Sequence, residues 1–152
     1  MKVKVREAVP EDTGTIAEYN LAMARETEDK ELDSDTLFEG VAAGIADPAR
    51  GTYYVAEVDG KLAACLLVTH EWSDWRNGWF WWIQSVYVTP DYRRRGLYSR
   101  MYKAVKSYAK EADRVVGFRL YVERENRRAQ QTYESLGMSE SGYLMFEEFV
   151  SS

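Results

Sequence analysis

The sequence predicts an α/β (α+β) fold: a mixed, mostly antiparallel sheet flanked by helices, in one domain spanning residues 1–152. Two dipeptides typical of tight hairpins, Asp59-Gly60 and Asn77-Gly78, separate three consecutive strand-like runs. A helical pattern then lies between two further strand-like runs, which indicates a β-α-β unit. Together these observations predict the order β-α-α-β-β-β-α-β-α-β. The chain is long enough for a single domain with a sizeable core.

The N-terminal part of the chain is expected to form one strand and two helices. Residues 2–7, KVKVRE, alternate as a strand does. Pro10 to Asp12 look like a helix start, with acidic residues in the first turn, and apolar residues follow at helical spacing. The charged segment 26–35 breaks the pattern. A second helix is predicted through residues 37–45, and it ends before Asp47-Pro48 because a residue preceding proline disfavours helix.

Three consecutive strands follow in the middle of the chain. Residues 52–58 and 61–72 flank Asp59-Gly60, and Asn77-Gly78 leads into residues 79–88, WFWWIQSVYV. Because such dipeptides join neighbouring antiparallel strands, these runs predict a meander.

The last third of the chain alternates helices and strands. A helix is predicted from Gly96, a strand over 116–122, a helix over 125–137 and a final strand over 142–150, GYLMFEEFV. The strand that ends at Val88 and the strand over 116–122 flank a helix, so they should be parallel with a right-handed crossover.

Composition argues against several classes of protein. Hydrophobic residues make up 45% and charged residues 30% of the chain, as in globular proteins. The net charge of −5 argues against a nucleic-acid partner, so any anion site must be local. The sequence has one cysteine, no signal-peptide pattern and no membrane-length apolar run. We therefore expect a cytoplasmic protein without membrane contact, and we expect no metal site.

Three arginines, Arg93, Arg94 and Arg95, gather just before Gly96 at a predicted helix start. A helix N-terminus already has partial positive charge, so three cations there are unfavourable unless an anion lies among them. Amides at a helix start after a strand bind anions, glycine permits close backbone approach, and guanidinium groups suit phosphate. We interpret this segment as a pyrophosphate-binding loop. The alternative is a solvated basic turn.

Two segments in the second half of the chain have a specific pattern: PDYRRRGLY (90–98) and YVERENRRAQQTYESLGM (121–138). Together they resemble the GNAT superfamily of acetyl-CoA-dependent N-acetyltransferases. The first is similar to the family's acetyl-CoA motif, Gln/Arg-x-x-Gly-x-Gly/Ala. The second is similar to its Glu-Asn-x-x-Ala-x-x-x-Tyr-x-x-x-Gly-Phe/Met segment. The matching positions are Arg93, Gly96, Asn126, Ala129, Tyr133 and Gly137. Tyr98 departs from the motif, since the family prefers Gly or Ala there.

The resemblance implies transfer of an acetyl group from acetyl-CoA to a primary amine of a small molecule or peptide, by direct attack in a ternary complex. In that family the strand before the loop splays from the next parallel strand. Its backbone amides hold the pantetheine arm and polarise the acetyl carbonyl. The cofactor-binding residues that the resemblance implies are Val86, Tyr87, Val88, Arg93, Arg94, Arg95, Gly96, Leu97, Tyr98, Ser99, Asn126 and Ala129.

One catalytic residue is implied by the resemblance. Tyr133 matches the family's general acid, which protonates the departing thiolate. Packing on an apolar helix stripe is the alternative role for this tyrosine. Asn126 is also suited to cap the helix that follows it. Cys65 lies in an apolar strand and is interpreted as a core residue, which argues against an acetyl-cysteine intermediate.

The general base is not identified by the sequence. Several family members have a Glu or His on the strand before the loop, but Gln84 and Ser85 stand on that strand here and do not accept a proton at neutral pH. The candidates acting through water are Glu26, Glu28 and Glu71. His70 is the one histidine, and a lone histidine at the end of an apolar strand is more often structural.

The acceptor side is indicated by an aromatic hairpin that contains Trp72, Trp75, Trp79, Trp81 and Trp82. Strand alternation places Trp79 and Trp81 on one face and Phe80 and Trp82 on the other. One face is expected to be core, and the other to form an aromatic wall for the acceptor or a homodimer contact. The acidic segment 26–33 lies where the family's acceptor often enters, and it suits a cationic amine. A solvated loop is the alternative.

Two other functions stay open. The same loop would hold a different acyl-CoA donor equally well. A non-catalytic acyl-CoA-sensing module is the second alternative; the unidentified base favours it, and Tyr133 argues against it.

Overall fold

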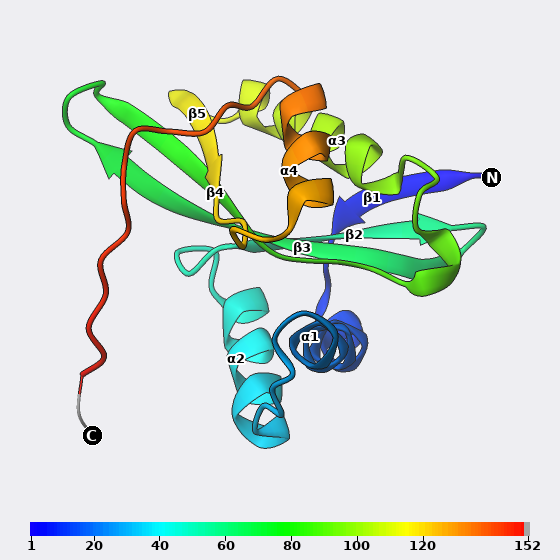
Figure 1. Cartoon of the computed structure of the whole chain (residues 1–152). Helices are drawn as coiled ribbons and strands as arrows, with labels where there is room; N and C mark the ends of the chain where they lie inside the picture. The colour runs from blue at the N-terminus through cyan, green and yellow to red at the C-terminus, as the bar shows by residue number, and fades with distance from the viewer. Residues whose placement is uncertain (151–152) are drawn as a thin grey trace. The chain divides into compact units, whose positions relative to one another are not determined.

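The computed structural model of the chain describes residues 1–150, in two compact units that divide after Tyr121. The first unit contains a five-stranded sheet in the order β1-β2-β3-β4-β5 (Figure 1). Its strands are β1 (Val3–Glu7), β2 (Thr52–Val58), β3 (Lys61–Ser73), β4 (Gly78–Val88) and β5 (Val115–Leu120). The first four strands pair antiparallel, and β4 pairs parallel with β5. The predicted mixed, mostly antiparallel fold is confirmed.

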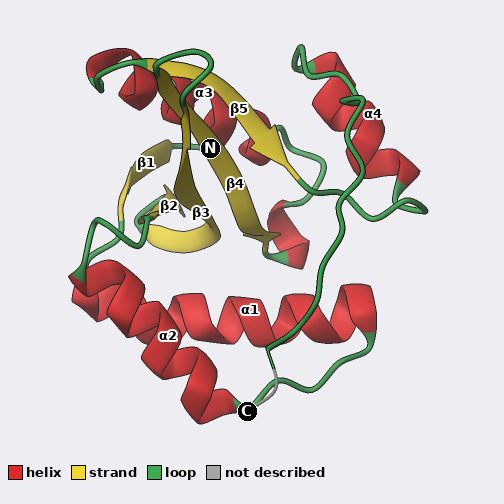
Figure 2. Ribbon diagram, turned by 90° about the vertical axis from the view of Figure 1, so that its left-hand side faces the viewer, coloured by secondary structure: helices red, strands yellow, loops and turns green. Residues whose placement is uncertain are grey.

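Helices cover both faces of this sheet. Helices α1 (Thr13–Glu28) and α2 (Ser34–Ala46) lie on one face, and α3 (Leu97–Glu111) lies on the other (Figure 2). Short 3-10 turns, η1 (Pro10–Asp12) and η2 (Pro90–Tyr92), precede α1 and follow β4. Helix α1 continues three residues into the segment 26–35 predicted as a break, and α2 begins at Ser34, so the break is confined to residues 29–33. Across the described residues, no helix combines the length and hydropathy that a membrane span requires.

The hairpins form where the turn dipeptides predict them. Asp59 and Gly60 both have positive φ, 50° and 85°, as a tight turn between antiparallel strands requires. Asn77 has a φ of 48° before Gly78 and ends the turn between β3 and β4. In this second hairpin Trp72 faces Trp79 and His70 faces Trp81 across the strands, which confirms that Trp79 and Trp81 share one face.

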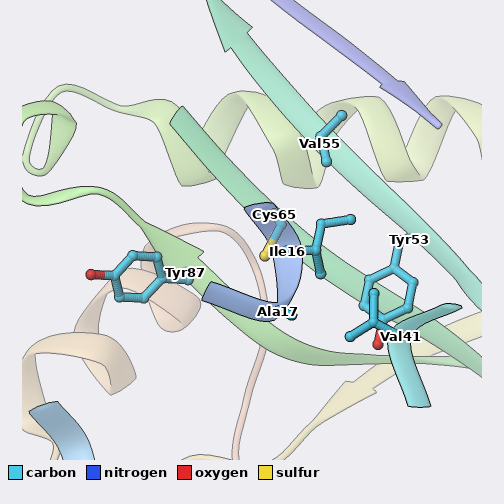
Figure 3. Packing of buried hydrophobic residues seen from close by; sticks show 7 residues of the cluster. All are labelled: Ile16, Ala17, Val41, Tyr53, Val55, Cys65 and Tyr87. Carbon is cyan, nitrogen blue, oxygen red and sulfur yellow. The ribbon is translucent and has the colours of Figure 1, made fainter. Parts of the chain in front are cut away.

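One hydrophobic core cluster lies between the sheet and the α1–α2 pair. Ile16 and Ala17 of α1 and Val41 of α2 pack with four residues of the sheet (Figure 3). Those four are Tyr53, Val55, Cys65 and Tyr87. Burial of this apolar surface is the main free-energy gain that holds the helices on the sheet. Cys65 is fully buried, as the prediction of a core role requires.

Over its described residues, 122–150, the second unit contains one helix, α4 (Arg127–Ser135). The Asn126 side chain accepts a hydrogen bond from the amide of Ala129 at 3.1 Å, so it caps this helix. Gly137, with a φ of 100°, follows the helix end in a conformation that favours glycine. The predicted strand over 142–150 is wrong, since residues 144–150 of the described chain adopt no regular structure. The described sheet ends at β5, and a segment of strand-like composition becomes a strand only when a neighbour pairs with its backbone.

Candidate functional site

The end of β4 lacks a partner on the β5 side. Pairing with β5 runs from Trp79 to Ile83 and then stops, while β4 continues to Val88. On its other side β4 stays paired with β3, past an irregularity where Ser85 has a φ of 52°. The backbone groups of residues 84–88 on the β5 side are therefore not used by the described sheet. Such an open strand end can bind an extended ligand arm by main-chain hydrogen bonds.

The loop after β4, residues 93–96, presents a row of amides. We call it the arginine loop. Arg94 and Gly96 have positive φ, 62° and 77°, and Leu97 begins α3. Within residues 1–150, the amides of Arg94, Arg95, Gly96 and Leu97 donate to no backbone or side-chain acceptor. Consecutive amides in this kind of turn, at the positive end of a helix, form an anion-binding concavity.

The three arginines of this loop have different surroundings. Arg94 and Arg95 have no carboxylate within 4.0 Å among the described residues, and the Arg95 guanidinium lies 5.6 Å from the centre of the Tyr92 ring. Arg93 turns away from the loop amides. Its Nε donates to the Val88 carbonyl at 2.8 Å, and its Nη2 pairs with Glu26 Oε2 at 3.0 Å. Thus two of the three positive charges are left for an external anion.

Tyr98, the departure from the acetyl-CoA motif, points along α3. Its ring lies nearly parallel to that of Tyr102, one turn later, with 6.2 Å between the ring centres. The side chain is half-buried, as is that of Ser99. Gly96 has open space where a Cβ would be, so close approach of a ligand to the loop backbone is sterically possible.

The two glutamates at the end of α1 are already paired. Glu26 contacts Arg93 as described, and Glu28 Oε1 lies 3.4 Å from Lys30 Nζ. Burial and then interaction with Glu26 raise the pKa of Tyr87, which is buried. Both carboxylates are therefore engaged by a cationic side chain of the described chain.

Glu71 and His70 lie on β3 in the aromatic hairpin. Glu71 Oε1 accepts hydrogen bonds from Trp82 Nε1 at 2.8 Å and Arg119 Nη1 at 2.9 Å. These contacts lower the pKa of Glu71, the Trp82 hydrogen bond most strongly. Partial burial lowers the pKa of His70, whose ring packs 5.6 Å from that of Trp81. A low pKa makes a carboxylate a weak base at neutral pH.

The hairpin exposes indole rings at its tip. Trp75 is 85% exposed, while Trp72 and Trp79 pack edge-to-face with ring centres 5.0 Å apart and remain partly exposed. On the opposite face the Arg119 guanidinium lies 3.6 Å above Phe80, and Trp82 packs against Tyr121. On the first face Trp81 is buried, as the prediction of a core face requires, whereas Phe80 and Trp82 on the other face are half-buried.

The remaining predicted site residues belong to the second unit. Asn126 and Ala129 form the helix cap of α4, and Tyr133 is half-buried on the same helix. Burial raises the pKa of Tyr133, so its hydroxyl is protonated at neutral pH, as a general acid must be. Burial also raises the pKa of Cys65 to about 12, which keeps this thiol protonated and unreactive.

A scan of known families matches the model for the "Acetyltransferase (GNAT) family" to residues 15–138, which is most of the chain. The chain belongs to the GNAT acetyltransferase family. The match includes the open end of β4, the arginine loop and α4. The resemblance inferred from the two motifs is thus confirmed.

Known relatives of this GNAT protein agree with that assignment. The crystal structure of a possible acetyltransferase from Clostridium difficile 630 is 47% identical, covers the whole of both chains and superposes with a TM-score of 0.92. A "predicted acetyltransferase with acetyl-CoA" from Clostridium acetobutylicum shares the fold, with 16% identity, a TM-score of 0.77, and 97% and 96% of the chains covered. Spermidine N(1)-acetyltransferase of Escherichia coli K12 is 29% identical over 98 residues, which is 64% of this chain. The match spans half the length of that relative.

Sequence reasoning missed the contact between Glu26 and Arg93. The two residues are 67 positions apart, and neither the charged segment nor the motif indicates that they meet. They come together because α1 packs across the sheet near the end of β4.

Proposed function

We propose that this GNAT protein transfers an acetyl group from acetyl-CoA to a primary amine. The observation that supports the proposal most directly is that the open end of β4 is followed closely by the arginine loop. Among the described residues, four amides of this loop have no hydrogen-bond acceptor. Two of its arginines, Arg94 and Arg95, have no carboxylate within 4.0 Å. A pyrophosphate with an extended pantetheine arm has the charge and the shape that this arrangement suits.

The chain's residues would then act as follows. Arg94, Arg95 and the loop amides hold the pyrophosphate, and the backbone of residues 86–88 orients the pantetheine arm. An amide of the same strand polarises the thioester carbonyl. The amine nitrogen forms a bond to the acetyl carbon, the carbon–sulfur bond breaks, and the amine proton passes to water or a carboxylate. Tyr133 gives its proton to the departing thiolate and regains one from solvent.

The acceptor is proposed to be a small or peptide amine that has a positive charge. Acidic residues border the end of α1, and aromatic rings line the β3–β4 hairpin, a combination that suits cations. The named activity of the Escherichia coli relative makes polyamines the first class to test. We also propose a cytosolic location, because a buried free thiol suits a reducing compartment.

The test is a panel of amines with acetyl-CoA, followed by release of the coenzyme A thiol. The panel contains a polyamine, a lysine-like diamine, a peptide N-terminus and an amine without a second charge. Turnover with at least one amine, absent when the amine is omitted, is the expected result. Tight acetyl-CoA binding without turnover on any amine would favour the acyl-CoA-sensing alternative. One observation supports that alternative: each candidate carboxylate base already has an ion-pair or hydrogen-bond partner within the chain.

The acyl donor is tested by the same assay. Replacing acetyl-CoA with succinyl-CoA or a longer acyl-CoA leaves the pyrophosphate contacts unchanged and alters only the group at the end of β4. Faster turnover with one of these donors than with acetyl-CoA would identify that acyl group as the one the protein transfers.

A further inference from the structure

The side chain of Arg93 connects three parts of the first unit. Nε donates to the Val88 carbonyl at 2.8 Å, and Nη2 donates to Glu26 Oε1 and Oε2 at 3.2 and 3.0 Å. The guanidinium also lies 5.3 Å from the centre of the Tyr87 ring. Arg93 therefore joins the end of β4, the arginine loop and the last turn of α1.

Tyr87 extends the same set of contacts into the core. Its ring belongs to the buried cluster, and its hydroxyl points away from the other labelled members of that cluster (Figure 3). Glu26 interacts with this tyrosine and raises its pKa, second to burial. Tyr19 of α1 packs on the same ring, with 5.3 Å between ring centres. Contacts with α1 thus hold Tyr87 directly and hold Val88 through Arg93.

These contacts act on the part of β4 that has no β5 partner. A strand end that is paired on one side has fewer hydrogen bonds to keep it in place. The contacts from Glu26 and Arg93 lie on that end and replace part of the missing constraint.

We propose that Glu26 is a positioning residue for acyl transfer: through Arg93 it holds the end of β4 in register, and Arg93 is not a phosphate ligand. This inference rests on the proposed function. Glu26 neutralises Arg93 and keeps its guanidinium directed toward Val88, so phosphate binding is left to Arg94, Arg95 and the loop amides.

A rival role makes the opposite prediction. If Arg93 binds phosphate and Glu26 merely competes for it, then Glu26→Gln releases Arg93 and tightens coenzyme A binding, while Arg93→Ala weakens it. A positioning role predicts that both substitutions lower kcat/KM, and that kcat/KM of the double variant is no lower than that of either single variant.

The experiment is a double-mutant cycle on Glu26→Gln and Arg93→Ala, with Glu18→Gln as the control. Glu18 is an exposed glutamate on the same helix, so this control makes the same change of charge. We expect kcat/KM to fall by about tenfold or more in both single variants and in the double variant, because small misplacements of reacting groups are costly. The coenzyme A Kd, measured by calorimetry, should stay within about twofold in all variants, as for contacts outside the phosphate site.

Hydrogen exchange gives a readout that needs no activity. Amides of residues 84–88 should exchange faster in both single variants, by about threefold or more, and should not change in Glu18→Gln. Additive losses, opposite changes in coenzyme A affinity, or unchanged exchange at residues 84–88 would overturn the proposal. If the natural chain shows no turnover on any amine, the proposed function fails, and the exchange and affinity results still decide whether Glu26 positions β4.

Discussion

The indole Nε1 of Trp82 donates a hydrogen bond to Glu71 Oε1 at 2.8 Å, across the β3–β4 hairpin. Arg119 Nη1 donates to the same oxygen at 2.9 Å. These two contacts lower the pKa of Glu71, so the carboxylate is ionised but weakly basic at neutral pH. Of the candidate bases, Glu71 is thus the one with two hydrogen-bond donors from the sheet.

Glu71→Gln tests whether this carboxylate is the general base. We expect turnover to fall less than about tenfold, because loss of a true general base costs roughly 10²–10⁴ in rate. The measurement is kcat over a range of pH, with the same variant's melting temperature beside it. A loss within the larger range, together with disappearance of the acidic limb of the pH profile, would make Glu71 the base.

Arg95→Glu should weaken coenzyme A binding because it places a negative charge at the arginine loop. A hydrogen bond to a charged group contributes about 1.5–3 kcal/mol, so we expect a loss of at least about tenfold in affinity. Calorimetry measures it, and Lys110→Glu, at the far end of α3, serves as the control. Equal affinities in the two variants would refute the phosphate role of the loop.

Tyr133→Phe separates acid catalysis from packing. The ring and its burial remain, so the melting temperature and acetyl-CoA affinity should change little. Turnover should fall by roughly 10²–10⁴ if the hydroxyl protonates the thiolate. Tyr133→Ala, which also leaves a cavity, is the comparison for packing. Normal turnover of the Phe variant would exclude Tyr133 from the mechanism.

Asp12 should make stability depend on pH at the acid end. Its carboxylate accepts from Arg6 Nη1 and the Val9 amide, both at 2.8 Å, and the Arg6 hydrogen bond most strongly lowers its pKa. The unfolded chain then binds a proton more readily than the folded chain. The stabilisation is therefore complete above the unfolded pKa and is lost as the pH falls through the folded pKa.

Asp12→Asn is expected to remove that dependence. At pH 7 we expect a loss of about 1–3 kcal/mol in the free energy of unfolding, since a buried hydrogen-bonded charge is lost. The difference in the free energy of unfolding between this variant and the natural chain should become smaller toward pH 3, as measured by thermal melts. Asp91→Asn, at an exposed position, is the control. A constant difference across this pH range would contradict the argument.

The C-terminal segment predicts self-association. Six large apolar side chains there are 61–94% exposed: Tyr143, Leu144, Met145, Phe146, Phe149 and Val150. Exposed apolar surface of this kind marks protein interfaces, so we propose a homodimer that covers it. Light scattering should show a dimer in the natural chain and a smaller species for Phe146→Ser with Phe149→Ser. Phe38→Ser, at an exposed phenylalanine of α2, should stay dimeric. A monomeric natural chain would end the proposal.

Local sequence signals were sufficient for most of the fold. Asp59-Gly60 and Asn77-Gly78 predict both hairpins because glycine, asparagine and aspartate adopt positive φ more readily than other residues. The helical stripe after Gly96, between two strand-like runs, predicts the parallel β4–β5 pair because a helix that crosses back over the sheet starts the next strand in the same direction. The motif around Arg93 and Gly96 also predicts the position of the arginine loop, whose amides have no acceptor among the described residues.

The tertiary structure alone decided what these residues contact. Residues 142–150 have the apolar and aromatic composition of a strand, yet strand formation depends on a neighbouring backbone, which no local pattern reveals. Arg93 matches a cofactor motif, but its charge is directed to Glu26, 67 positions away, because packing of α1 on the sheet brings the carboxylate there. Sequence thus determined the elements from β1 to α4 and their order, through short-range conformational preferences. Long-range packing determined which charges are neutralised within the chain and which are left to bind a ligand.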